Sequence, residues 1–220
     1  MKNKDEKFVF EKTDFDYTNP NALVIIVGIT PGNSQLKDSR EGKSLEEIKR
    51  ENAFAGNMRP NLVSMLDSIG INRMLGIESC RSLWGEDFSK VEMTSLLKDA
   101  TYEIKKDGTK MMFRDTSKIA KSPKLTQLYE RGFIEDCHHY SKAKIFVACG
   151  KSVYDRLIEL QSKGIITAPI VGIAHPSGAN AGRISSYLGK KTPKDASEAW
   201  CQTRAEEARD IIAEINSFFT

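Results

Sequence analysis

Short apolar runs alternate along the chain with longer stretches in which apolar positions recur every three or four residues. The runs are 22–29 (ALVIIVGI), 91–97 (VEMTSLL), 144–149 (KIFVAC) and 169–174 (PIVGIA). Runs of this length, rich in Val and Ile, are typical of strands buried on both faces of a parallel sheet. Residues 102–107 predict a further strand, short and exposed.

The stretches between these runs predict helices over 44–55, 62–69, 125–140, 152–160 and 195–219. Ser44 and Glu47 fit a capping box at the start of the first helix. Gly70 is expected to end the second helix and Gly132 to interrupt the third. The last helix is amphipathic, and its predicted stripe is Trp200, Ala208, Ile211, Ile215 and Phe218.

Strands alternating with helices predict an α/β sheet covered by helices on both faces. Aromatic residues within 1–21 predict an arm that packs on the body, and we expect one domain over 1–220. In such sheets, ligands bind beyond the carboxyl ends of the strands. That rule selects residues 30–35, 95–98 and 175–180.

Composition narrows the class of protein but not its function. With 40% hydrophobic and 29% charged residues, the chain is neither collagen-like, coiled-coil nor wholly disordered. Four dispersed cysteines without a C-x-x-C pair predict no disulfide scaffold, metal site or iron-sulfur cluster. No apolar run approaches the roughly 18 residues of a membrane span, and no signal peptide is evident. We therefore expect a soluble protein of the cytoplasm.

Two loops at the predicted ligand edge could carry chemistry. Residues 28–35 (GITPGNSQ) combine glycines, a stiffening proline and polar side chains, but match neither a P-loop nor a G-x-G-x-x-G fingerprint. A strand-to-helix turn with polar caps is the equal alternative. His175 directly follows the last strand, where an imidazole can donate a hydrogen bond to developing negative charge. His138 and His139 are interpreted as surface or packing residues.

GITPG (28–32) and AHPSG (174–178) resemble the two signature motifs of the uracil-DNA glycosylase superfamily. Between them, Phe54-Ala55-Gly56 with LVSMLDSIGI, the strand 91–98 and the strand-glycine-helix unit 144–154 resemble further segments of that superfamily. The resemblance spans about residues 22–188. It implies a three-layer α/β/α sandwich around a mainly parallel four-stranded sheet. It also implies base excision from DNA, with no cofactor.

The resemblance also implies a role for each site residue. Phe54 would stack on an extruded uracil or other non-standard base, and Ser95, or Thr94, would read its edge. Thr30 or Asn33 would orient water, and His175 would stabilise the base as it leaves. The other implied base-binding residues are Gly28, Ile29, Pro31 and Gly32. The implied DNA-binding residues are Ser177, Gly178, Asn180, Arg183, Lys190 and Lys191.

Several positions depart from the superfamily. Ile29 and Thr30 stand where active members commonly carry Asp, Asn or Glu, and Ala179 stands where several carry a Leu wedge. Cys137 lies near a position that holds an iron-sulfur cluster in some branches, but the N-terminal cysteine pair is missing, so no cluster is expected. The alternatives are an active glycosylase, a catalytically inactive nucleobase- or nucleic-acid-binding module, and an interaction protein that has lost the pocket.

Charge is distributed unevenly although its sum is small. The chain has 33 Lys and Arg against 30 Asp and Glu, a net charge of +3. Basic residues dominate 105–131 and 183–194, and acidic residues dominate 195–215. Basic loops beside the predicted pocket suit phosphate contacts, and a solvated basic face is the alternative for 105–131. Tyr187 is expected either to pack in the interior or to probe DNA, and packing is preferred.

Overall fold

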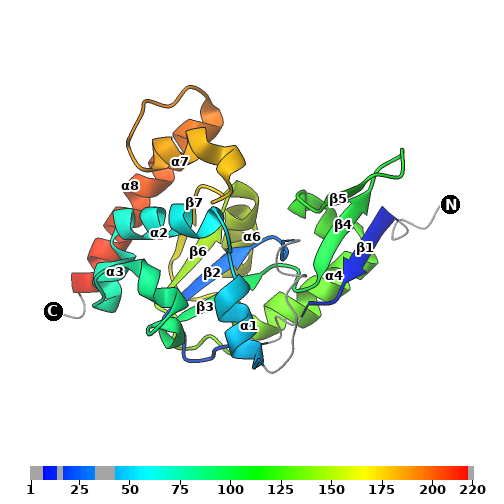
Figure 1. The fold of residues 1–220 in the computed structure, drawn as a ribbon, viewed down its shortest axis with the longest axis horizontal. Helices are drawn as coiled ribbons and strands as arrows, with labels where there is room; N and C mark the ends of the chain where they lie inside the picture. The colour runs from blue at the N-terminus through cyan, green and yellow to red at the C-terminus, as the bar shows by residue number, and fades with distance from the viewer. Residues whose placement is uncertain (1–6, 14–16, 33–42, 218–220) are drawn as a thin grey trace.

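A four-stranded parallel sheet forms the centre of the computed structural model, which describes residues 7–13, 17–32 and 43–217 (Figure 1). The strand order is β3 (Val91–Ser95), β2 (Val24–Gly28), β6 (Ile145–Cys149) and β7 (Ile170–Ile173). Every neighbouring pair in this sheet is parallel. The predicted fold class is confirmed, and all four predicted central strands are present.

Alternating side chains of β2 divide the core into two halves. Val24 and Ile26 face one cluster of buried side chains, and Ile25 and Val27 face the other. The helices of the first cluster are α2 (Met58–Ile69), α3 (Ile71–Leu75), α7 (Ala181–Tyr187) and α8 (Ala196–Ser217). Those of the second include α4 (Pro123–Tyr129) and α6 (Lys151–Ser162). Both faces of the sheet are therefore covered, which explains the uninterrupted apolar runs.

The predicted helix ends correspond to specific caps. The capping box of Ser44 and Glu47 is formed at the start of α1 (Leu45–Asn52). Gly70 ends α2 in the left-handed conformation, with φ of 90°. The interruption near Gly132 is a turn of π-helix (Glu130–Ile134) between α4 and α5 (Glu135–Cys137). The short 3-10 turns are η3 (Cys80–Trp84), η4 (Phe88–Lys90), η5 (Thr116–Lys121) and η7 (Gly178–Asn180).

A second, antiparallel sheet stands beside the first (Figure 1). It contains β1 (Phe8–Glu11), β4 (Ala100–Ile104) and β5 (Lys110–Met112), in the order β1-β4-β5. The N-terminal arm thus packs on the body as predicted, but as a strand. The strand expected over 102–107 begins two residues earlier and turns back as a hairpin. Sequence periodicity did not predict β1 as a strand, because it pairs with β4, which lies far away in the chain.

The buried stripe of α8 differs from the prediction. Its buried apolar residues are Cys201, Ala205, Ala208, Ile212 and Ile215. Trp200 and Ile211 are only partly buried at the margin, and Phe218 lies outside the described residues. Gly172 lets the helix approach β7 closely, because a Cβ at that position would lie 3.1 Å from Trp200. The prediction favoured large side chains and therefore chose a face rotated from the buried one.

A buried ion pair joins α1 to the sheet. Lys49 and Glu92 form a salt bridge, with side chains 3% and 1% exposed. The ammonium also donates to the Tyr17 carbonyl at 2.6 Å, and the backbone N–H of Asn19 donates to Glu92 at 2.7 Å. This network holds the segment before β2 against β3.

Among the helices that the structure describes, none has the length and apolar character needed to cross a membrane.

Candidate functional site

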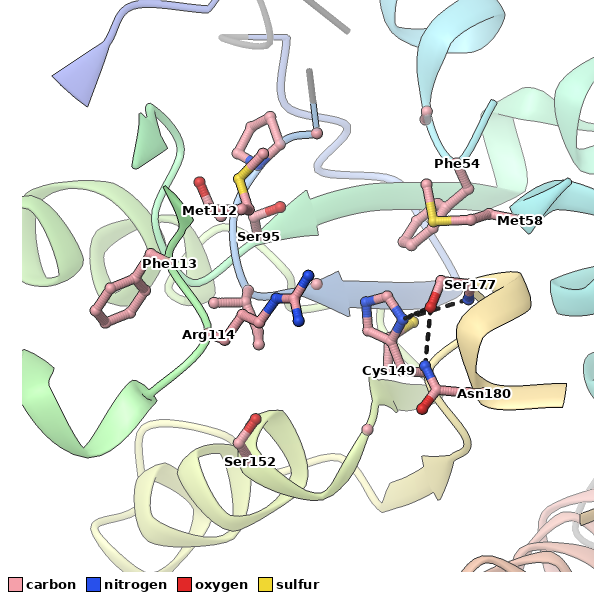
Figure 2. A pocket seen from close by; sticks show the side chains of 18 of the residues that line it. Phe54, Met58, Ser95, Met112, Phe113, Arg114, Cys149, Ser152, Ser177 and Asn180 are labelled. Atoms are coloured by element: carbon pink, nitrogen blue, oxygen red, sulfur yellow. Dashed lines mark hydrogen bonds between the residues drawn. The ribbon is translucent and has the colours of Figure 1, made fainter. Parts of the chain in front are cut away.

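A cavity of about 610 Å³ opens where the parallel strands end. Its walls come from 28–32 after β2, 93–95 on β3, 149–152 after β6 and 175–180 after β7. Phe54 and Met58, before and at the start of α2, and 112–114 from the small sheet complete it (Figure 2). The volume is that of a small-molecule site, and its position agrees with the rule for parallel sheets.

The structure fixes the ring orientation and the tautomer of His175. The backbone N–H of Ser177 donates to Nδ1 at 3.3 Å, so this nitrogen is an acceptor without a proton. The Ser177 hydroxyl lies 3.1 Å from the same atom and accepts from Asn180 Nδ2 at 2.8 Å (Figure 2). The neutral ring therefore carries its proton on Nε2. Burial lowers the pKa of His175, and the charge of Arg114 lowers it further, which favours this neutral form.

Gly150 lies beside His175 where β6 ends. It follows β6 with φ of 98°, and a Cβ there would lie 3.5 Å from Cβ of His175. This left-handed backbone turns the chain from β6 into α6 and is readily adopted only by glycine. The backbone conformation is therefore the reason for a glycine here, since a Cβ would make only an ordinary contact with His175.

Phe54 lies in the cavity wall on a strained backbone. Its φ of 51° is the one positive value among described residues other than glycine. The preceding carbonyl, of Ala53, accepts hydrogen bonds from Trp84 at 2.8 Å and Arg59 at 3.3 Å, which hold the turn. Phe54 and Met58 both line the cavity (Figure 2). A bulky side chain in this conformation costs about 1–3 kcal/mol, a strain that is often found at functional sites.

The loop after β2 is tied to the small sheet through Thr30. Its hydroxyl donates to the Asp99 carbonyl at 2.8 Å and accepts from the N–H of Thr101 at 2.9 Å. Only one lone pair remains for a ligand, so Thr30 could accept from a water but could not donate to it. Asn33, the other residue expected to orient water, lies outside the described residues.

Ser95 supplies a free hydroxyl at the end of β3. It pairs in register with Gly28, where a Cβ would lie 3.4 Å from Ser95 Oγ. Both Ser95 and Thr94, the two expected base readers, line the cavity. Ser95 points into it (Figure 2), and its hydroxyl has no hydrogen-bond partner within the described ranges. It can therefore bond to a ligand without breaking an existing contact.

The residues expected to bind DNA separate into two groups. Ser177, Asn180 and Arg183 line the cavity, and Arg183 donates to Asn180 Oδ1 at 2.8 Å. Gly178, Lys190 and Lys191 do not line it. Lys191 instead forms a salt bridge with Glu198 at 2.6 Å. Tyr187 is completely buried among the helices, so the preferred packing interpretation is confirmed.

Several lining residues were not predicted from the sequence. They include Met58, Met93, Met112, Arg114, Cys149, Lys151 and Ser152, whereas Lys98 belongs to the predicted segment 95–98. Arg114 belongs to the basic segment 105–131, but nothing in the sequence distinguishes it from the neighbouring cations. Cys149 and the residues after it adjoin a predicted strand end, and the rule that selected 175–180 could also have selected them.

The lining is cationic. It contains Lys98, Arg114, Lys151 and Arg183, and no Asp or Glu within the part of the chain that the structure describes. Lys98 is paired with Asp136 at 2.5 Å and Lys151 with Asp155 at 2.8 Å. The same part of the chain contains no cluster of three metal-ligating side chains. The site therefore favours anionic ligands and offers no carboxylate base from these residues.

No model of a known protein family matches the chain. Uncharacterized protein YoxB of Bacillus subtilis (strain 168) is 30% identical over 191 residues, which cover 80% of this chain and 73% of YoxB. The chain belongs to the YoxB family. Among solved structures, SMUG2 of Pedobacter heparinus is similar to this YoxB-family chain at a TM-score of 0.47 and 13% identity. The superposition covers 90% of this chain and 77% of the SMUG2 chain. At this distance no site residue or chemistry can be carried over.

Proposed function

We propose that the cavity binds a base extruded from DNA and that the protein hydrolyses the N-glycosidic bond of that base. One observation carries this proposal. Phe54 and the protonated Nε2 of His175 come from distant segments and share one cavity of about 610 Å³. An aromatic face and a fixed donor are the two groups that a flipped base needs for stacking and for stabilisation as it departs.

Base binding would rely on Phe54 and Ser95. Stacking on an aromatic side chain contributes about 1–3 kcal/mol per base, comparable to the few kcal/mol that extrusion costs. The free Ser95 hydroxyl can bond to a polar edge of the base. Backbone groups of 28–32 lie in the same wall, with Gly28 and Gly32 allowing close approach. None of these contacts with the base involves a charged side chain.

Catalysis would rely on stabilising the departing base. The bond between the base nitrogen and the sugar C1′ breaks, and its electron pair moves onto the base. The N–H at Nε2 of His175 donates a hydrogen bond to the resulting anion. Water adds hydroxide to C1′ and releases its proton to solvent. Removing one such fixed donor typically lowers the rate 100- to 1000-fold.

DNA would lie across the mouth of the cavity. One wall of the cavity is lined by Ser177, Asn180 and Arg183. The exposed Lys190 lies further along the same segment, after α7. Across the cavity, Arg114 begins a run of exposed or half-buried cations that includes Lys121 and Lys124. Phosphate contacts of this kind make binding fall steeply with salt concentration.

A catalytically inactive nucleobase-binding module is the second candidate. The absence of Asp and Glu from the lining, over the described residues, favours it. Such a module would use the same stacking and edge contacts but would leave the glycosidic bond intact.

Base release separates the two candidates. Purified protein is incubated with single- and double-stranded DNA containing uracil, hypoxanthine, xanthine or a modified cytosine, and the free base is measured by mass spectrometry. We expect release by the wild type, loss in His175→Ala and no change in His139→Ala, which alters an exposed histidine outside the cavity. Thermal stabilisation by free bases without release would support the module. If the protein neither releases a base nor is stabilised by free bases, both candidates are refuted.

A further inference from the structure

Arg114 extends into the cavity from the small sheet (Figure 2). Its neighbour Phe113 is 2% exposed and packs edge-on against Phe8 at a ring separation of 5.9 Å. The N–H of Phe113 donates to the Thr101 carbonyl at 2.9 Å. On the other side, Asp115 caps η5 by accepting from the N–H of Ser117 at 3.1 Å. The backbone that carries Arg114 is therefore anchored on both sides.

The guanidinium of Arg114 has no polar partner within the described ranges of the chain. The three other lining cations each have one: Lys98 bonds to Asp136, Lys151 to Asp155 and Arg183 to Asn180. Arg114 is thus the lining cation whose donors remain available to a ligand. It also lies close enough to His175 to contribute to the lowered pKa of that imidazole.

We propose that Arg114 and Nε2–H of His175 form an anion-binding subsite that takes the ionised edge of a planar base. This subsite rests on the proposed function and adds a second group to it. A guanidinium presents coplanar donors that match two neighbouring acceptors on a planar anion. The glycosidic electron pair that moves onto the departing base is delocalised over such acceptors, so Arg114 would contact it as the bond breaks.

A DNA phosphate is the other anion that Arg114 could bind, and the position of the side chain favours the base. Arg114 is near His175, and the two donors therefore share one space within the cavity. A phosphate bound there would occupy the place of the base. Exposed cations outside the lining, such as Lys121 and Lys190, are better placed for the DNA backbone.

The test uses free bases, so that it depends on neither DNA nor catalysis. Calorimetry compares uracil, which is neutral at pH 7.5, with 5-nitrouracil, which is an anion at that pH. The wild type should prefer the anion by about tenfold or more, as expected for a charge-assisted hydrogen bond. Arg114→Gln should abolish this preference and Arg114→Lys should retain part of it. Arg131→Gln removes the same charge from the same basic segment, but outside the cavity, and should behave as the wild type.

Each outcome separates the subsite from the glycosylase. Equal affinity of the wild type for both bases, no binding of either, or an unchanged preference in Arg114→Gln would overturn the subsite. A preference that depends on Arg114, without base release from DNA, would keep the subsite and refute the glycosylase. Because Arg114 is exposed, its variants should melt with the wild type, and a large drop in Tm would instead assign it a structural role and overturn the proposal.

Discussion

The backbone N–H of Ser177 donates to Nδ1 of His175 at 3.3 Å, which leaves the imidazole proton on Nε2. A backbone donor cannot reverse its role as a hydroxyl can. Protonating the ring at Nδ1 would therefore break this bond and place a cation near Arg114. The neutral ring is the form that the fold stabilises.

We predict that NMR titration will give His175 a pKa below its ordinary value of about 6.5. Burial is the larger cause and Arg114 the smaller, so Arg114→Gln should raise the pKa only part of the way. Because the folded-state pKa is lowered, the associated stability is fully present above about pH 6.5 and is lost as the pH falls through the folded pKa. A measured His175 pKa at or above about 6.5 would contradict this.

Substitutions of Phe54 should separate backbone strain from base stacking. Phe54→Gly relieves the positive φ, whereas Phe54→Ala keeps it, so the glycine variant should be more stable by about 1 kcal/mol in urea unfolding. Both variants lose the aromatic ring and should bind free base about 10- to 100-fold more weakly. A more stable alanine variant would contradict the backbone strain at Phe54. Normal base binding by either variant would contradict the stacking role of the ring.

Thr30→Val should destabilise the fold by about 1–3 kcal/mol, because the fully buried Thr101 would lose the acceptor of its backbone N–H. Thr30→Ser keeps the hydroxyl and should unfold close to the wild type. Urea denaturation measures both. Equal stability of the two variants would show that the hydroxyl does not hold the loop to β4.

Lys49→Met should cost about 3–5 kcal/mol, because it leaves the buried Glu92 carboxylate without its cation. The double variant Lys49→Met with Glu92→Leu removes both charges and should recover much of that loss. Chemical unfolding of the two single variants and the double variant gives the coupling energy. Additive losses would mean that the two side chains do not stabilise each other.

The sequence predicted the parallel sheet and the edge that carries the cavity, because both follow from local patterns. A buried apolar run identifies each central strand, and parallel strands bring 28–32 and His175 to one edge. Arg114 could not be found in this way. Its position depends on pairing between β1 and β4 and on burial of Phe113, which join segments far apart in the chain.

The predicted contact of Lys191 with DNA stays a prediction, but the sequence did not reveal the ion pair that this lysine forms. Charge along the sequence does not reveal ion pairs, and the lysine bonds to Glu198 on the following helix. The stripe of α8 was misjudged because Cys201, Ala205 and Ile212 are buried, whereas Trp200 and Ile211 are only partly so. In both cases, the deciding neighbour lies on another element.

The two proposed hydrogen-bond donors to the ligand follow strands of separate sheets: His175 follows β7 of the parallel sheet, and Arg114 follows β5 of the antiparallel one. The hairpin between β4 and β5 can thus lengthen, shorten or exchange its side chains while the parallel sheet keeps its packing. Within the YoxB family, evolution could in this way change ligand preference at one wall of the cavity and retain the histidine at the other.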